Sequence, residues 1–540
     1  MTAGDVTGTV NETEAPAVAL ARERLASLRA SLQEREGAPV RLIETHISWV
    51  LLAKSLAYKL KKPVQLPFLD FSTLAARRHF CEEELRLNRR LAPALYLDVV
   101  DVCDGPQGPI FCGEPGNDGP VLDVAVRMRR FPDGALWSEM LAAGTLAAQH
   151  VDAMAQTLHA FHRDAAAAPA HSAFGLAPAH QRVVQGLVDG IAPSLNQIAT
   201  PALAAEWPAL CAWLSAQQRA LAPLWSGRQR EGRVRECHGD LHLANVLQWE
   251  GQATAFDGIE FDAEMRWIDV LDDVAFLAMD LLANRRRDLA FRLVNAYLAA
   301  SGDYAGLPAL RYFMVCRALV RARVGALAGQ QHVPSGSGSG CSAAQYLAVA
   351  TALSRSADAR LAITHGLPGS GKSFVAQAVS EAAGAICVRS DVERKRLFGL
   401  GALESSRGRV AGGIYGAATT RRTYARLLET AAVALSAGWP VVVDAAFLLR
   451  AERDEFAALA RSLAVPFTLF DCQAALPLLL IRLEQRQATG ADASEADATV
   501  LDRLIGVDEP VVHPESARAV VVDAARQEPA QALAQRWARS

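Results

Sequence analysis

The sequence predicts two folds in one chain: an α+β domain with a small β-rich lobe and a helical lobe, then an α/β domain with a parallel sheet. Three observations predict this. Short β-rich segments begin at Val40, helical patterns dominate from Ala147, and strands alternate with helices from Leu361. The alternation of strands and helices from Leu361 is typical of a parallel sheet with helices on both faces. At 540 residues the chain is long enough for several compact domains.

The composition is that of an ordinary globular protein, with 51% hydrophobic and 21% charged residues. The formal charge of -3 does not favour nucleic acid or an anionic membrane as a partner. No membrane-spanning apolar run occurs, and the polar start lacks the pattern of a secretory signal, so we expect a cytoplasmic protein. Nine cysteines without a CxxC pair argue against a zinc site or a disulfide framework and indicate reduced thiols.

The N-terminal domain follows a tail and helix in residues 1–38 and occupies residues 39–357. Its β-rich part is predicted to start with a hairpin of two strands, Leu42–Leu51 and Ser55–Pro63. The elements expected around it are a helix at Val18–Glu34, an amphipathic helix at Arg77–Leu91, and strands at Ala94–Asp101 and Val121–Phe131.

The helical lobe is interrupted by a short β segment at Cys237–Phe261 and continues through Tyr312–Leu327. The Gly/Ser run Ser335–Gly340 is either a linker or a loop between two helices of one domain, because Tyr346–Arg355 resumes a helical pattern. We therefore place the boundary near residues 356–360 and the second domain at residues 358–540. Its strands are expected to begin at Leu361 and to continue with Ala385–Arg389, Pro440–Val443, Pro466–Phe470 and Ala519–Val522.

A phosphate-binding loop follows the first of these strands and precedes a helix. It matches GxxxxGK[ST] and consists of Gly366, Leu367, Pro368, Gly369, Ser370, Gly371, Lys372 and Ser373. Backbone N–H groups of such a loop and the positive end of the following helix face phosphate oxygens. Lys372 is expected to reach the β- and γ-phosphates and Ser373 to hold Mg²⁺. ATP and Mg²⁺ are therefore the expected cofactors.

A second constellation lies upstream, in Cys237-His-Gly-Asp-Leu-His-Leu-Ala-Asn and the later Asp257. An Asp, an Asn five residues on, and a second Asp after a hairpin have the spacing of a kinase catalytic loop. Asp240 would accept the proton of the acceptor hydroxyl, while Asn245 and Asp257 would hold Mg²⁺. Positioning and charge stabilisation would supply most of the catalysis. His238 is expected to be a structural residue of the loop.

These motifs resemble the aminoglycoside phosphotransferase and choline kinase superfamily over residues 40–355. The resemblance implies a kinase-like fold, in which Asp273 anchors the catalytic loop. It also implies a strand lysine paired with a helix glutamate: Lys61 is the best match, Lys59 the second because residues two apart share a strand face, and Glu84 the partner. No GxGxxG loop is present between Val40 and Lys54, which departs from the protein kinases.

The second domain resembles P-loop kinases of the gluconate kinase, polynucleotide kinase and zeta-toxin type. The resemblance implies that Asp391 is the base and that Arg389 and Arg394 contact the acceptor, although Ser390 or Asp391 could equally cap a helix. Asp444 ends an apolar strand, as a Walker B carboxylate does, and would orient Mg²⁺ through water. Arg482 and Arg486, four apart on one helix, are either lid arginines that close over the phosphates or charges that solvate the helix.

The whole chain resembles a bacterial fusion of an aminoglycoside-phosphotransferase-like kinase domain with a P-loop domain of the AAA family. This resemblance implies a bifunctional phosphotransferase. Each of its two sites would bind ATP and Mg²⁺ and transfer the γ-phosphate to a hydroxyl group of a small molecule. Two alternatives stay open: one domain is a nucleotide-sensing module or pseudokinase that controls the other, or the chain is a protein or nucleotide kinase with a toxin-like C-terminal domain.

Overall fold

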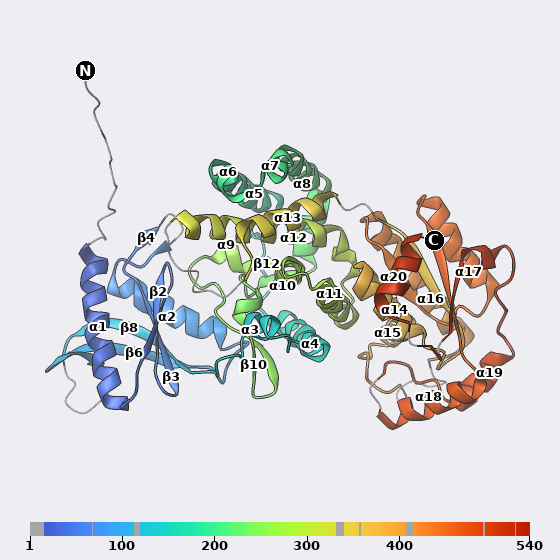
Figure 1. Ribbon diagram of the computed structural model, residues 1–540, viewed down its shortest axis with the longest axis horizontal. Helices are drawn as coiled ribbons and strands as arrows, with labels where there is room; N and C mark the ends of the chain where they lie inside the picture. The colour runs from blue at the N-terminus through green and yellow to red at the C-terminus, as the bar shows by residue number, and fades with distance from the viewer. Residues whose placement is uncertain are drawn as a thin grey trace, which may run out of the picture. The chain divides into compact units, whose positions relative to one another are not determined.

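The computed structural model describes residues 16–66, 69–112, 119–330, 340–355, 358–406, 414–489, 492–523, 525–526 and 528–539 (Figure 1). The predicted tail before residue 16 and the Gly/Ser run up to Ser339 lie outside them. The described residues form two compact units. The first contains the chain up to Leu136 and residues 254–266, and the second contains residues 137–253 and the chain from Trp267 onward.

The first unit is built on a six-stranded antiparallel sheet in the order β1-β2-β3-β8-β6-β7. Its strands are β1 (Arg41–Glu44), β2 (Ser48–Leu52), β3 (Leu56–Lys61), β6 (Tyr96–Gly105), β7 (Gly108–Phe111) and β8 (Val121–Arg129). The unit also contains α1 (Pro16–Glu36), α2 (Leu74–Asn88), α9 (Ala263–Arg266) and the short strands β4 (Gln65–Leu66) and β5 (Leu69–Asp70).

Strand β3 divides its side chains between two environments because successive residues of a strand point to opposite faces. Tyr58 and Leu60 join a core cluster with Leu25 and Leu28 of α1. Lys59 and Lys61, on the opposite face, reach Glu84 of α2. The alternation in β3 therefore places Tyr58 and Leu60 against α1 and the two lysines against α2.

The predicted hairpin is wrong in one respect, since Leu42–Leu51 is not one strand. The chain turns between β1 and β2, where Thr45 Oγ1 accepts a hydrogen bond of 3.0 Å from the backbone N–H of Ser48. Thr and Ser hydroxyls stabilise such turns by replacing a backbone partner. A three-stranded meander, β1-β2-β3, results. Strand β7 was not predicted.

The second unit begins with a helical region, as the sequence predicted. Its helices are α3 (Trp137–Ala142), α4 (Ala148–Asp164), α5 (Ala177–Ile191), α6 (Leu195–Ile198), α7 (Pro201–Ala205), α8 (Trp207–Arg230), α10 (Val270–Ala283), α11 (Arg287–Ser301), α12 (Leu307–Gln330) and α13 (Ala343–Arg355). Short strands lie around the predicted catalytic loop: β9 (Val234–Glu236), β10 (Val246–Trp249), β11 (Gln252–Ala255) and β12 (Trp267–Asp269).

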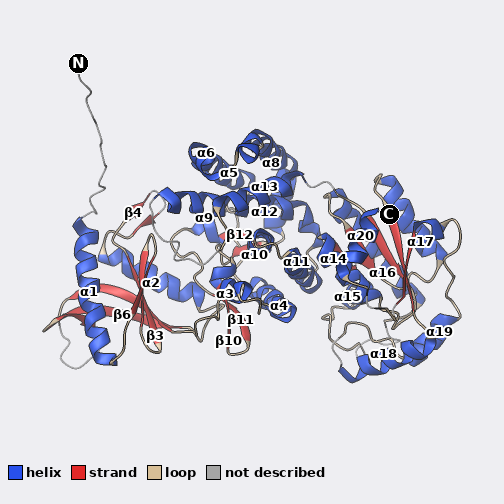
Figure 2. Ribbon diagram, viewed as in Figure 1, coloured by secondary structure: helices blue, strands red, loops and turns tan. Residues whose placement is uncertain are grey.

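The rest of the second unit is the predicted α/β domain, with a five-stranded parallel sheet in the order β14-β15-β13-β16-β17. The strands are β13 (Leu361–His365), β14 (Ile386–Arg389), β15 (Val441–Asp444), β16 (Phe467–Gln473) and β17 (Ala519–Asp523). Helices enclose the sheet (Figure 2): α14 (Lys372–Ala383), α15 (Ser390–Arg396), α16 (Ala417–Ser436), α17 (Arg450–Ser462), α18 (Leu476–Thr489), α19 (Ala498–Ile505) and α20 (Ala530–Arg539).

Helix α11 of the helical region contacts the α/β domain through polar side chains. The Asn295 amide donates to the carbonyl of Ala385 and accepts from the N–H of Cys387, both at 2.9 Å. Arg292 bonds Asp152 of α4 at 2.6 Å and Glu381 of α14 at 2.8 Å. The strand that carries Arg389 and the helix that follows the phosphate-binding loop are therefore both fastened to α11.

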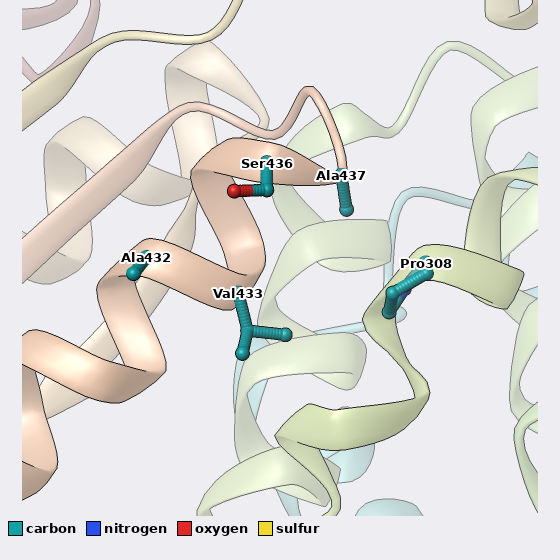
Figure 3. Close-up of a pocket in the computed structure, with 5 residues that line it drawn as sticks. All are labelled: Pro308, Ala432, Val433, Ser436 and Ala437. Carbon is teal, nitrogen blue, oxygen red and sulfur yellow. The ribbon is translucent and has the colours of Figure 1, made fainter. Parts of the chain in front are cut away.

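A second contact forms around Trp439, which precedes β15. Its indole N–H donates to the carbonyl of Leu307 at 3.1 Å, and the Arg311 guanidinium lies 4.3 Å from the ring centroid. Beside this contact is a shallow pocket of about 390 Å³ (Figure 3). None of the predicted phosphate-handling residues lines it; its lining residues are Pro308, Ala432, Val433, Ser436 and Ala437.

Two of the nine cysteines are bonded, which corrects the expectation of reduced thiols. Cys103 and Cys112 form a disulfide. The antiparallel pairing of β6 with β7 brings the Cα atoms of the two cysteines to 5.6 Å, within the usual range for a disulfide.

Among the described helices, none has the length and apolar character that crossing a bilayer requires.

Candidate active sites

A buried cluster of two lysines and three carboxylates occupies the α2 side of the sheet in the first unit. Glu84 accepts from Lys59 at 2.9 Å and from Lys61 at 2.8 Å. Lys59 also pairs with Asp257, and Lys61 with Glu260. Burial alone would raise the pKa of Glu84, but the two lysine charges outweigh it and lower that pKa to about 2. Glu84 is therefore ionised at neutral pH.

The two lysines differ in what surrounds them. Lys61 is fully buried, lies 5.0 Å from the centroid of the Phe71 ring, and pairs with the buried Glu260. Lys59 is 12% exposed and pairs with Asp257, whose side chain is 41% exposed. Lys59 therefore lies beside the predicted metal ligand, while Lys61 lies in the interior. The two candidates therefore differ in exposure and in the second carboxylate that each contacts.

Asp257 is held in an unusual backbone conformation, with φ at +61°. Residues other than glycine adopt this region at an energetic cost and often do so at functional sites. The backbone N–H of Asp257 donates to the Tyr96 hydroxyl at 3.1 Å, and that of Gly258 donates to Asn88 Oδ1 at 2.8 Å. These two bonds hold the backbone at Asp257 in this conformation.

The predicted catalytic loop lies in the second unit and is anchored by Asp273. The carboxylate of Asp273, fully buried, accepts from the backbone N–H groups of His238 and Gly239, each at 2.8 Å. Arg317 of α12 donates to the carbonyl of Gly239 at 3.0 Å. The loop backbone that carries Asp240 is thus fixed from two helices.

Asp240 and Asn245 lie together within this loop. The Asn245 amide donates to the backbone carbonyl of Asp240 at 2.9 Å and to its carboxylate at 3.1 Å. His242 Nε2 lies 3.4 Å from that carboxylate. Burial would raise the pKa of Asp240, but His242, Arg321 and His238 outweigh it and hold that pKa well below its usual range. An ionised carboxylate here can accept a hydrogen bond from a hydroxyl and orient it.

A buried group of metal-ligand type lies beneath the loop: the ligand atoms of His162, Cys237 and Asp273 lie within 4.8 Å of one another. Each already has a partner in the protein. His162 contacts Asp273 at 3.2 Å and the Tyr297 hydroxyl at 2.9 Å, and the Cys237 thiol lies 3.5 Å from the carbonyl of Ile268. The group therefore serves as a hydrogen-bonded anchor of the loop.

The phosphate-binding loop of the second unit requires glycine at several positions. Gly366, Gly369 and Gly371 have φ values of +135°, +84° and +89°, which L-residues rarely adopt. A side chain at Gly366 would also collide with the carbonyl oxygen of Cys472. The Ser370 hydroxyl is buried and has no partner among the described residues. Such an orphaned polar atom fits a loop whose donors are arranged for a phosphate.

Lys372 and Ser373 are the first two residues of helix α14, which begins two residues earlier than the sequence predicted. Lys372 Nζ donates to the carbonyl of Leu367 at 2.8 Å, and burial lowers the pKa of the lysine despite the nearby Asp444. Asp444 is the last residue of β15 and is buried. A serine hydroxyl and a carboxylate are the oxygen ligands that Mg²⁺ prefers, so Ser373 and Asp444 fit this ion.

The residues predicted to hold the acceptor have different surroundings. Asp391 lies in the first turn of α15. Arg394 is buried, donates to the carbonyl of Ile414 at 3.3 Å, and lies 5.2 Å from the centroid of the Tyr415 ring. Arg389 points instead to two residues that the sequence predicted to hold Mg²⁺, since it contacts Ser373 and Asp444.

The predicted lid arginines lie on α18. Arg482 donates to the carbonyl of Gly369 in the phosphate-binding loop at 3.1 Å, and Arg486 to the carbonyl of Ala496 at 2.5 Å. One arginine thus contacts the loop and the other the segment after α18.

The sequence did not single out Glu260, Arg317 and Asp492. Of these, only Glu260, three residues after Asp257, carried a local signal.

Comparisons with known proteins support the two-part organisation. A family model described as an AAA domain matches residues 361–511. Rv2004c of Mycobacterium tuberculosis and Mb2027c of Mycobacterium bovis, both called uncharacterized proteins, are 30% identical to this chain over 462 residues, 85% of this chain and 88% of theirs. The chain belongs to the family of these mycobacterial proteins. The match is longer than either domain, so the family shares parts of both.

Solved structures of two kinases are also similar to parts of this family member. A choline/ethanolamine kinase family protein from Mesorhizobium loti is 14% identical, covers 62% of this chain and 95% of its own, and has a TM-score of 0.36. A gluconokinase from Sinorhizobium meliloti is 22% identical, covers 34% of this chain and 96% of its own, and has a TM-score of 0.25. The predicted order, an α+β region with a β-rich part and a helical part followed by an α/β P-loop domain, is confirmed.

Proposed function

We propose that the protein is an ATP-dependent phosphotransferase with two sites, each transferring the γ-phosphate of ATP to a hydroxyl group of a small molecule. The observation that carries the proposal is that candidate phosphate-handling residues occur both before and within the P-loop domain. Before it, Lys59 pairs with Glu84 in the first unit, and Asn245 bonds Asp240 in the second. The P-loop set includes Lys372 and Ser373.

Each set supplies the roles that phosphoryl transfer needs. In the kinase-like region Asp240 orients the acceptor hydroxyl, Asn245 and Asp257 are the metal ligands, and Lys59 contacts phosphate. In the P-loop domain Ser373 and Asp444 hold Mg²⁺, and Asp391 is the base. Magnesium, when bound, neutralises the charge that develops on the phosphate oxygens.

The test separates the two sites by single substitutions. ADP release is measured against a panel of small hydroxyl compounds with the wild type, Asp240→Asn, Lys372→Ala and the double variant. Removing the hydroxyl-orienting carboxylate should lower turnover of one subset of acceptors by about 10²- to 10⁴-fold. Lys372→Ala should abolish turnover of a different subset, and the double variant should turn over neither.

The exposed Asp133, 72% accessible, gives a matched control, since Asp133→Asn should leave every rate unchanged. Acceptor-dependent ADP release that persists in the double variant would refute the proposal. So would a single subset of acceptors that is lost equally with either substitution, because it would indicate one reaction.

A second candidate is that one domain senses nucleotide and controls the other. The contacts of α11 favour it. Tyr297 of this helix bonds His162, which contacts the loop anchor Asp273, and Asn295 bonds the backbone of β14. If Asp240→Asn changes no rate while Lys372→Ala abolishes all turnover, this candidate replaces the first.

A further inference from the structure

Arg389 has an unexpected place in the P-loop domain. It is the last residue of β14, and the register of the parallel sheet sets it directly opposite Asp444, the last residue of β15. Binding sites of parallel sheets form at this carboxyl edge. The sheet itself therefore brings an arginine beside the carboxylate that fits Mg²⁺.

The guanidinium of Arg389 contacts three oxygens. Nε lies 3.2 Å from Asp444 Oδ2, and Nη2 lies 3.5 Å from Ser373 Oγ and 3.1 Å from Asp492 Oδ1. Two of these partners, Ser373 and Asp444, are the residues that fit the metal. The planar fork of an arginine can hold all three contacts at once, which a lysine ammonium does less well.

A magnesium ion held by Ser373 and, through water, by Asp444 would need oxygens that the guanidinium now contacts. Two cations that share these oxygens repel each other, so the guanidinium and Mg²⁺ compete for them. Arg389 is 31% exposed, so it has room to turn outward. Asp492 offers it a place to stay: burial alone would raise the pKa of Asp492, but Arg389 outweighs it and lowers that pKa.

We propose that Arg389 is a built-in cation that neutralises the magnesium ligands in the nucleotide-free protein and is displaced towards Asp492 when a magnesium nucleotide binds. Arg389 is thus a positioning residue that makes metal binding depend on nucleotide. The inference rests on the proposed function, because it assumes that this domain binds a magnesium nucleotide. It replaces the role of Arg389 as an acceptor contact.

The test follows the anisotropy of a fluorescent ADP, and the component of binding that Lys372→Ala removes is taken as that of the P-loop site. The quantity compared is the affinity of this component with Mg²⁺ divided by its affinity with EDTA. In the wild type this ratio is small, because Mg²⁺ must displace Arg389 and because Arg389 already offsets the charge of Asp444. In Arg389→Ala the ratio should rise about tenfold or more, since Asp444 repels metal-free ADP and Mg²⁺ meets no competitor.

Two further variants exclude a purely structural effect. In the Asp444→Asn background, Arg389→Ala should change the ratio less than twofold, because the carboxylate on which the competition depends is gone. Arg360 pairs with Asp358 at 2.6 Å just before β13, where the amino ends of the strands lie. Arg360→Ala should therefore leave the ratio at the wild-type value. Arg389→Lys keeps a charge but loses the fork, and its ratio should lie between those of the wild type and Arg389→Ala.

The outcomes separate the two proposals. If the wild type binds the fluorescent ADP and Arg389→Ala shows the wild-type ratio, the inference about Arg389 is wrong and the nucleotide site stands. If Arg389→Ala raises the ratio equally in the Asp444→Asn background, the inference is also wrong. If Lys372→Ala removes no component of ADP binding, with or without Mg²⁺, the proposed function of this domain fails, and the inference fails with it.

Discussion

Lys61 gives the sharpest prediction about stability, because its side chain is fully buried and holds two carboxylates. In Lys61→Met, Glu84 keeps Lys59 as a partner, but Glu260, 5% exposed, loses its cation. Removing one partner of a buried ion pair costs about 3 to 5 kcal/mol. We expect Lys61→Met to lower the local free energy of unfolding around β3 by about this amount.

Hydrogen exchange of peptides that contain β3 measures this quantity, since it reports local opening even when a large protein does not unfold in two states. The adjacent residue supplies the control. Lys62 pairs at 2.7 Å with Glu44, which is 32% exposed and keeps Arg22 as a second partner. Lys62→Met should therefore cost about 1 kcal/mol or less.

A double variant makes the reasoning refutable. If the cost comes from the uncompensated charge of Glu260, then Lys61→Met with Glu260→Gln should recover more than half of it, because both charges are gone together. A loss below about 1 kcal/mol in the single variant, or additive losses in the double variant, would contradict the idea that Lys61 acts through Glu260.

Two other predictions concern pH and backbone geometry. The pKa of Glu84 is depressed in the folded protein from 4.5 to about 2, so its contribution to stability is present above pH 4.5 and is lost as the pH falls towards 2. At about 1.4 kcal/mol per pH unit this is roughly 3 kcal/mol; acid unfolding of Glu84→Gln should lack this component, and an unchanged acid profile would be evidence against it. Gly366→Ala should abolish the component of fluorescent ADP binding that Lys372→Ala also removes, because the added carbon collides with the Cys472 carbonyl at a φ of +135°. Gly416→Ala, with open space around the site, should bind ADP normally; equal binding by both variants would show that the loop tolerates a side chain.

The P-loop domain could be predicted strand by strand because its apolar runs are short, bounded by turns, and separated by helices. The N-terminal sheet was harder. The turn at Thr45 interrupts a continuous β-rich run, and only the Thr45 hydroxyl, which bonds the N–H of Ser48, reveals it. Strand β7 has four residues and pairs only with β6, too little for a sequence pattern to detect.

Contacts among the candidate site residues could be predicted where a motif fixes them, but not where a partner comes from far along the chain. The spacing of Asp240 and Asn245 is local, and so is their contact. Choosing between Lys59 and Lys61 required the positions of Asp257 and Glu260, about 200 residues later. Arg389 could be placed at the end of β14, but its contact with Asp492, 103 residues away, depends on tertiary structure.

The fastening of β14 to α11 limits how this chain can be divided. A fragment cut at residue 358 would keep the nucleotide motif but lose Asn295, leaving the carbonyl of Ala385 and the N–H of Cys387 without their partner. It would also uncover Trp439, now 2% exposed, and its indole N–H would lose Leu307. Unpaired backbone groups destabilise a small domain, and a solvent-exposed tryptophan promotes aggregation. An expression fragment of the P-loop domain should therefore begin before α11.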